Sequence, residues 1–266
     1  MNEPSIPSDD SNSSFRFGLI HVFLGVALLA VAFAFIASAM RAATIQQEAI
    51  ANLRFTGWEV DATMASLSRD SSPKAIPRGQ LQNLGKLTSL TKLHLAQVRL
   101  EREDIPELAP LTNLRELRLR SCQFDGDAIG WIEQLASLQE LHFLDCSPPP
   151  EEFVRAAPNL PIEELTIARL DQAAAEAIGK MPRLTRLTIQ AGDLPVLPLA
   201  TLARSSSIHT LELLYCNCTN EGAQALIAWK SLKTVELGPR TDMSVEGWAE
   251  LIKVRPDLNI VHLSGK

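Results

Sequence analysis

The sequence predicts an α/β solenoid: a ladder of short parallel strands with helices on its convex side, preceded by one transmembrane helix. Two observations predict this fold class. An apolar pattern of the form L-x-x-L-x-L occurs eight times from Leu90 onward at almost constant spacing. Near the N-terminus, the stretch from Phe17 to Met40 contains no formally charged residue. A repeated unit cannot bury its apolar face alone, so the repeats must stack on one another. A long uncharged apolar stretch is suited to the interior of a lipid bilayer.

Composition narrows the class of protein. With 46% hydrophobic and 21% charged residues, the chain is not disordered, collagenous or a multi-span membrane protein. One Tyr, nine Phe and four Trp indicate an aliphatic core, which suits a repetitive architecture. With a formal net charge of −6, the chain has no overall positive charge to attract a phosphate backbone, so we expect no nucleic-acid partner. Four cysteines without a CxxC pair give neither a disulfide scaffold nor zinc spacing.

The N-terminal region predicts a tail and an anchor. Residues 1–16 are rich in Ser, Asp, Asn and Pro, and we expect a disordered tail. Residues 17–40 would span roughly 36 Å as a helix, which is enough to cross a bilayer. We therefore expect a single-pass membrane protein that contacts the lipid bilayer through Phe17 to Met40.

Two other interpretations of this stretch stay open. One is a buried helix of a soluble protein, although uninterrupted apolar runs of this length seldom occur there. The other is a cleaved signal peptide, because Ala37, Ser38 and Ala39 match the small-residue pattern before a cleavage site. Against cleavage, the apolar run exceeds the usual 7–15 residues or so and the tail is acidic. Arg41 and Arg54 favour a cytoplasmic C-terminal domain only weakly, so the side of the membrane stays open.

Residues 41–79 connect the anchor to the repeats. Apolar residues at helical spacing in 41–56 indicate that the helix continues, and a short strand is expected around Trp58. Residues 66–79, with Ser, Asp, Pro and Gly, indicate a linker or an irregular N-terminal cap. The repeat domain is predicted to cover residues 80–266.

The repeated apolar pattern predicts the strand ladder. Successive copies start 24, 24, 24, 22, 24, 24 and 26 residues apart. Alternate side chains of a strand share a face, so we expect each L-x-L to be a strand whose apolar residues point into the solenoid. The copies start at Leu90, Leu114, Leu138, Ile162, Leu184, Ile208, Leu232 and Leu258.

Helices are expected between the strands, on the convex side. Asp171 and Asn220 are predicted N-caps, and Pro182 and Pro256 are expected to stop helices before the next strand. Pro148, Pro149 and Pro150 are expected to start a helix at Glu151. The helical segments with apolar residues at suitable spacing are 125–135, 171–180, 220–229 and 245–254.

Over residues 80–266 the chain resembles the leucine-rich-repeat family, whose units have 20–29 residues. Cys122, Cys146 and Cys216 stand three residues after the second apolar strand residue, the Asn/Cys position of the family signature. The sequence CNCTNEGAQAL at 216–226 looks like the strand-to-helix turn of the cysteine-containing, ribonuclease-inhibitor-like subtype. The remaining repeats depart from the signature with Val98, Leu170, Gly192 and Arg240.

With its anchor, the whole chain resembles a small bacterial membrane-anchored leucine-rich-repeat protein. The resemblance implies a ladder of strand side chains that is open to a partner. The middle residue of the last strand is expected to be His262. The early part of the ladder is basic and the later part acidic, which suggests docking steered by charge. A merely solvated surface is the alternative interpretation. The candidate residues for a protein-binding face are Lys92, His94, Arg118, Arg120, His142, Arg186, Glu212 and Glu236.

No residue pattern indicates metal binding. His94 and His142 lie two rungs apart, roughly 10 Å, with Arg118 between them, so they cannot share a zinc ion. Glu116, Glu140 and Glu164 form a column beside Arg and Lys, which suggests charge pairing.

No pattern indicates catalysis either. Nucleophile-elbow, P-loop and HExxH motifs do not occur in the sequence, and no cofactor is expected. Cys122, Cys146 and Cys216 are expected to be structural, whereas Cys218 is out of register and expected to be exposed.

Two functions remain. The first is a membrane-anchored, non-catalytic scaffold that binds a protein partner of unknown identity through its repeat surface. The second is a structural envelope protein that associates laterally, without a specific soluble ligand.

Deletion of residues 17–40 tests the anchor. We expect the deleted chain to leave the membrane fraction, because the remaining sequence has no comparable apolar run. Membrane and soluble fractions of cells that express the full and deleted chains give the measurement. A deleted chain that still sediments with membranes would show that the helix is not the attachment.

Overall fold

The computed structural model describes residues 13–69, 73–125, 129–146, 151–194, 196–238 and 241–263. The chain divides into two compact units, Met1–Glu48 and Ala49–Lys266. Residues 1–12, which are most of the predicted tail, lie outside the described residues.

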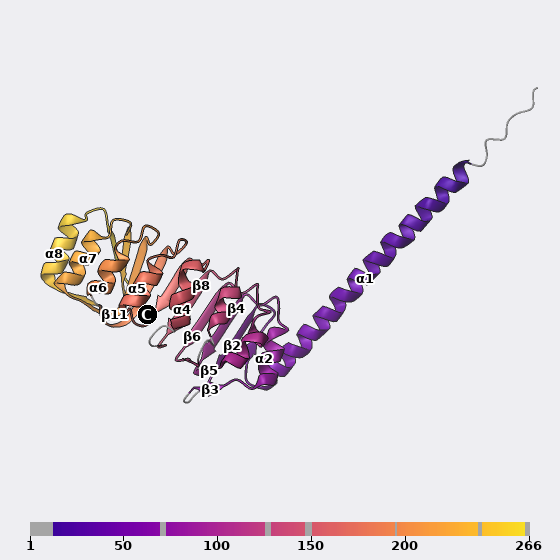
Figure 1. Cartoon of the computed structure of the whole chain (residues 1–266), viewed down its shortest axis with the longest axis horizontal. Helices are drawn as coiled ribbons and strands as arrows, with labels where there is room; N and C mark the ends of the chain where they lie inside the picture. The colour runs from indigo at the N-terminus through magenta and orange to yellow at the C-terminus, as the bar shows by residue number, and fades with distance from the viewer. Residues whose placement is uncertain are drawn as a thin grey trace, which may run out of the picture. The chain divides into compact units, whose positions relative to one another are not determined.

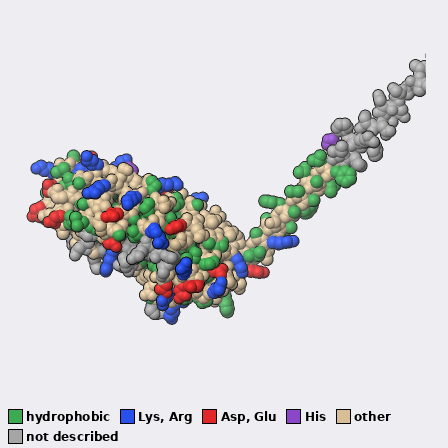
Figure 2. All heavy atoms as spheres, viewed as in Figure 1, with side chains coloured by type: hydrophobic (Ala, Val, Ile, Leu, Met, Phe, Trp, Pro, Cys, Tyr) green, Lys and Arg blue, Asp and Glu red, His purple; other side chains and the backbone are tan. Residues whose placement is uncertain are grey.

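The first unit contains most of a long helix, α1 (Ser13–Phe55). The segment His21–Phe55 contains an apolar stretch whose side chains are not buried. Large side chains such as Phe23, Leu28 and Phe35 are 65–76% exposed. Hydrophobic side chains cover this part of the helix, whereas charged side chains of both signs are interspersed over the repeats (Figure 2). By length and composition the helix is able to cross a membrane.

The second unit is a solenoid with a strand ladder on one side and helices on the other (Figure 1). Neighbouring strands follow the order β1-β2-β4-β6-β8-β9-β10-β11-β12-β14, and β13 also pairs with β11. All pairs in this ladder are parallel except β1 with β2, which is antiparallel. The predicted fold class and all eight predicted strands are confirmed. The ladder strands are β1 (Glu59–Val60), β2 (Met64–Ser68), β4 (Lys92–Ala96), β6 (Glu116–Arg120), β8 (Glu140–Leu144), β9 (Glu164–Ile167), β10 (Arg186–Asp193), β11 (Thr210–Cys218), β12 (Thr234–Leu237), β13 (Asp242–Met243) and β14 (Asn259–His262).

Shorter elements complete each turn of the solenoid. A small parallel sheet runs beside the ladder and contains β3 (Lys74–Ala75), β5 (Val98–Leu100) and β7 (Gln123–Phe124). The helices are α2 (Arg78–Gly85), η1 (Arg102–Asp104), α3 (Ile105–Leu108), η2 (Gly130–Gln134), α4 (Glu151–Ala156), η3 (Ala157–Asn159), α5 (Gln172–Ile178), α6 (Val196–Leu202), α7 (Asn220–Ala228) and α8 (Val245–Val254), where η marks a 3-10 helix.

One column of apolar residues shows how the register builds the core. The first apolar residue of each L-x-L pairs with its counterpart on the next strand, and every member is at most 1% exposed. Burial of such a side chain contributes about 1.5–3 kcal/mol relative to an exposed one. Neighbouring rungs therefore supply the burial that a single repeat cannot. The column contains Leu93, Leu117, Leu141, Leu165, Leu187, Leu211 and Val235.

The last rung departs from the predicted register. Glu236 pairs with Val261, and Leu237 pairs with His262. Ile260 takes the core-facing position instead and packs against the core. The prediction that His262 belongs to the middle column is therefore wrong, because the 26-residue spacing leaves Ile260 opposite the buried Val235. The His262 ring lies 5.7 Å from the ring of Trp248 on α8.

Side-chain caps mark the starts of α5, α7 and α8. Asp171 caps α5 as predicted, since its Oδ1 accepts from the Ala174 N–H at 2.7 Å. At α7 the prediction is wrong by one residue: Thr219 accepts from the Gly222 N–H at 3.3 Å, and Asn220 is the first helical residue. A β-region backbone at Thr219 leaves its hydroxyl facing the free N–H groups.

Two further helix predictions include residues that lie outside the described ranges. In segment 125–135, the described residues contain the 3-10 helix η2 in place of an α-helix. Helix α4 begins at Glu151 as predicted, while the prolines at 148–150 lie outside the described residues.

The N-terminal end of the solenoid is closed by the end of α1 and the first strands. Leu53 is fully buried, and the Arg54 guanidinium donates to the Val60 carbonyl at 2.9 and 2.6 Å. The Trp58 Nε1 donates to the Gln80 Oε1 at 3.0 Å. Strand β2 is a full rung that pairs in parallel with β4, although its sequence MASLS lacks the leucine pattern. The ladder thus starts upstream of the residues where the repeat is legible.

The signature cysteines form a buried ladder of thiols behind the strands. The Cys146 Sγ lies 3.4 Å from the Leu119 carbonyl and 3.5 Å from the Leu144 carbonyl, and it accepts from the Cys122 N–H at 3.3 Å. Cys122 and Cys216 contact carbonyls in the same way. Ser121, Asp145 and Tyr215, which precede these cysteines, have positive φ, as does Gln97 before Val98 at the same repeat position, all at 49–57°. This left-handed residue turns the chain so that the next side chain points inward.

Cys218 is also buried, at 4% exposure, so the prediction that it is exposed is wrong. Its position under the start of α7 explains the burial: a Cβ at Gly222 would lie only 2.9 Å from its Sγ. The four cysteines carry no disulfide.

Replacement of Cys146 by Ala tests the thiol ladder. We expect the free energy of unfolding to fall by about 1–3 kcal/mol, because the variant leaves the buried Cys122 N–H without its acceptor. Thermal unfolding of the full chain in mild detergent, followed by circular dichroism, gives the measurement. Cys218→Ala is the control, with an expected loss of about 1 kcal/mol or less, since its thiol makes only a long contact to the Thr219 carbonyl at 3.7 Å. Equal losses in the two variants would contradict the role of the ladder.

Candidate functional site on the concave face

The sheet face that points away from the helices is called the concave face below. Alternate side chains of the ladder strands reach it, and the parallel register aligns them into columns, in which residues on successive rungs are about 4.8 Å apart. The first column contains Lys92, Glu116, Glu140, Glu164, Arg186, Thr210 and Thr234. The middle column contains Ser66, His94, Arg118, His142, Thr166, Thr188, Glu212, Glu236 and Val261. The third column begins with Ser68, Ala96, Arg120 and Leu144.

Glu116 organises the basic end of the concave face. Its side chain is only 3% exposed, although it stands on the sheet surface. Burial alone would raise the pKa of this carboxyl, but the surrounding donors outweigh burial and lower the pKa to about 2. The carboxylate is therefore charged at neutral pH and holds its neighbours in place. The groups that contact it are the Lys92 Nζ at 2.7 Å, the His94 Nε2 at 3.0 Å and the Arg118 Nε at 2.5 Å.

His142 is the next residue along the middle column. Its Nδ1 lies 2.8 Å from the Thr166 hydroxyl, and its Nε2 lies 3.7 Å from the Glu140 carboxylate. Burial, followed by the positive charge of Arg118, lowers the pKa of His142, and the nearby carboxylates only partly oppose this. The imidazole is therefore neutral at physiological pH.

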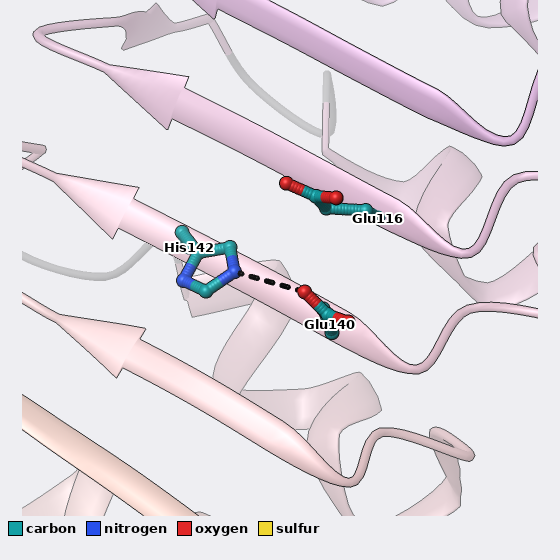
Figure 3. A group of neighbouring side chains, drawn as sticks. All are labelled: Glu116, Glu140 and His142. Carbon is teal, nitrogen blue, oxygen red and sulfur yellow. Dashed lines mark ion pairs between the residues drawn. The ribbon is translucent and has the colours of Figure 1, made fainter. Parts of the chain in front are cut away.

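Glu116, Glu140 and His142 lie close enough to suggest a metal site (Figure 3). Their ligand atoms are within 4.8 Å of one another. However, the Glu116 oxygens already contact the side chains of Lys92, His94 and Arg118, and the Arg118 guanidinium carries a fixed positive charge. A divalent cation would have to displace these partners and approach a fixed positive charge. The prediction that no metal binds here therefore stays in place.

The later half of the face is tied by longer links. The Arg186 Nη1 donates to the Glu236 carboxylate at 2.8 Å and so spans β11. The Thr188 hydroxyl donates to the Glu212 carboxylate at 2.8 Å. The acidic end predicted from the sequence is thus partly neutralised by Arg186.

The predicted site residues do not form a row of free charges along the ladder but are joined by ion pairs and hydrogen bonds. Most of them have an intramolecular partner. Arg120 is exposed and makes no ion pair within the described ranges. Sequence reasoning missed Glu116 as the centre of a cluster, although its place between basic neighbours was visible. It also missed Ser66 and Ser68, because β2 carries no leucine motif.

Two hollows lie on the concave face. The Arg120 hollow has a volume of about 230 Å³ and is lined in part by Ser66, Ser68, His94, Ala96, Arg118 and Arg120. The central hollow has a volume of about 250 Å³ and is lined in part by Arg118, His142, Thr166, Arg186, Thr188 and Glu212. Both form where small residues stand between longer ones, and Arg118 and Leu144 line both.

Solved structures give a fold likeness at low identity. A crystal structure of internalin C2 from Listeria monocytogenes is 18% identical, with 76% of this chain and 80% of that chain covered and a TM-score of 0.43. An internalin F structure from the same organism is 16% identical, with 83% and 74% covered and a TM-score of 0.44. A plant peptide hormone receptor, RGFR1 in complex with RGF2, is 17% identical, with 76% and 32% covered and a TM-score of 0.38.

No protein-family model matches the chain, and no curated protein matches it by sequence. The class of protein follows from the chain's own geometry. Its parallel strands recur at the repeat spacing, with apolar residues inside and helices opposite the ladder. This is a leucine-rich-repeat solenoid, with a long apolar helix at its N-terminal side.

Glu116→Gln tests the buried carboxylate. Because the pKa of Glu116 is lowered in the folded protein, its charge stabilises the fold above the pKa of an unfolded glutamate, about 4.3. That contribution is lost as the pH falls towards about 2. We expect the variant to be less stable by about 1–3 kcal/mol at pH 7, with the difference shrinking below pH 4 or so. Thermal midpoints between pH 7 and pH 2.5 give the measurement, and a difference independent of pH would contradict the assignment.

Proposed function

We propose that the protein is a membrane-anchored, non-catalytic scaffold of the cysteine-containing leucine-rich-repeat type, which binds a protein partner through its concave face. One observation carries this proposal. The first two columns of the concave face are mainly polar, no described element covers them, and mutual hydrogen bonds hold many of their side chains.

Preorganisation supports binding rather than simple solvation. Lys92, His94 and Arg118 are held by one buried carboxylate, so they lose little freedom when a partner docks. Ordering long side chains at an interface otherwise costs roughly 0.5–1.5 kcal/mol each. The two hollows offer places where partner side chains insert.

The arrangement argues against catalysis. His142 lies between the Thr166 hydroxyl and Glu140, in the order of a nucleophile, a base and an orienting acid. However, Thr166 is only 6% exposed. The backbone of β9 is paired with β8 and β10, so its N–H groups are engaged in the ladder rather than free to stabilise an oxyanion.

The anchor rests on α1. Its large apolar side chains are exposed along 22–40, which water does not favour and lipid does. Such an anchor would hold the repeat unit at one membrane face and raise the local concentration of a membrane-bound partner.

Photo-crosslinking tests docking on the concave face. A photoreactive residue at Gln190, which lines the central hollow, is placed in the full chain in its native membranes. We expect a protein adduct that is lost in the Arg118→Glu/Arg120→Glu variant, since charge reversal repels the partner. The same probe at the exposed Lys253 on α8 is the control and should give no such adduct.

Arg120→Glu alone guards against misfolding, because Arg120 has no intramolecular partner to lose in the described part of the chain. This single variant should weaken the adduct band by about threefold or more. An adduct unchanged in both variants would refute docking on this face.

A further inference from the structure

The Arg120 hollow owes its shape to the residues of the third column. Ser68 and Ala96 stand on neighbouring rungs before Arg120, and neither side chain fills the space above the sheet. Arg118 and Arg120 project from β6 and form the wall on the next rung. The hollow therefore has two serines and Ala96 among its small lining residues, beside two guanidinium groups.

No acidic residue is among the described residues that line the hollow. Arg118 uses its Nε on Glu116, while Arg120 makes no ion pair in the part of the chain that the structure describes. Lys92, Arg118 and Arg120 carry three positive charges against the two negative charges of Glu116 and the neighbouring Glu140, a surplus of one. The whole chain has a net charge of −6, so this surplus is a local feature.

The donors define the ligand chemistry. A guanidinium offers parallel N–H groups that match the two oxygens of a carboxylate. The hydroxyls of Ser66 and Ser68 have no described side-chain partner and add donors on the opposite rung. A volume of about 230 Å³ accommodates one acidic side chain.

We propose that the Arg120 hollow binds the side-chain carboxylate of an acidic residue in an extended segment of the partner, with Arg120 as its principal ligand. This inference rests on the proposed function and names the chemistry that the partner presents. The hollow and the central hollow share Arg118, so a segment with its acidic residue at Arg120 continues over the central hollow.

Binding of capped peptides tests the proposal. The full chain is placed in nanodiscs of phosphatidylcholine, which carries no net charge. The probes are hexaglutamate acetylated and amidated at its ends, hexaglutamine capped in the same way, and hexaglutamine with a free C-terminal carboxylate. Fluorescence anisotropy at about 0.05 M salt keeps screening weak. We expect binding of capped hexaglutamate and no binding of either hexaglutamine.

Two variants and a matched control locate the site. Arg120→Gln should weaken binding of hexaglutamate about tenfold, the loss of one charge-assisted contact. Ala96→Leu should weaken it about fivefold by filling the hollow without changing charge. Arg204→Gln removes the same charge after α6, away from the concave face, and should leave binding unchanged.

Equal weakening by Arg120→Gln and Arg204→Gln would overturn the proposal, because the attraction would then be long-range. Equal binding of uncapped hexaglutamine and hexaglutamate would also overturn it, since the terminus would be the ligand. Absence of hexaglutamate binding would overturn it as well. In each case the Gln190 adduct still reports separately whether a partner docks on the concave face.

Discussion

The parallel register of the ladder is the constraint on which the rest of the structure depends. A single strand with two inward apolar residues has no core, and only the rungs on either side bury them. Leu117 and Leu141, for example, are fully buried by their neighbours. Once this register is fixed, every other position of the repeat is fixed too. The signature cysteines then fall behind the strands, where their thiols meet carbonyls of the preceding rung.

The same register also places like charges next to one another on the concave face, where neighbouring basic side chains offset them. Columns of like residues bring carboxylates such as Glu116 and Glu140 onto adjacent rungs. A buried carboxylate is costly unless several donors reach it. Three basic side chains reach Glu116 and keep its carboxylate charged. Arg120 stands one column further along, beyond this cluster, and keeps its charge for an external partner.

Periodicity predicted the fold because apolar spacing reports directly on burial. It predicted the eight strands for that reason. The N-cap preference of Asp predicted the Asp171 cap, and the Asn/Cys position of the family signature predicted the inward thiols. It failed where the outcome depends on contacts between rungs. The central role of Glu116 requires the geometry of three side chains on two strands, and the burial of Cys218 requires the approach of α7. Strand β2 was missed because Ala65 and Leu67 fill its core positions without the full motif.

The number of neighbouring strands at each rung is related to where the Glu116 cluster and the two hollows lie. At the N-terminal end, Leu53 and the Arg54 contact to Val60 close the core, so the first rungs have neighbours on both sides. At the other end, β14 pairs only with β12 among the described strands, one residue away from the register that the apolar pattern predicts. A rung with one neighbour has half the pairing energy to hold its register. The hydrogen-bonded cluster and both hollows accordingly lie on rungs that are paired on each side, where side-chain positions are best defined.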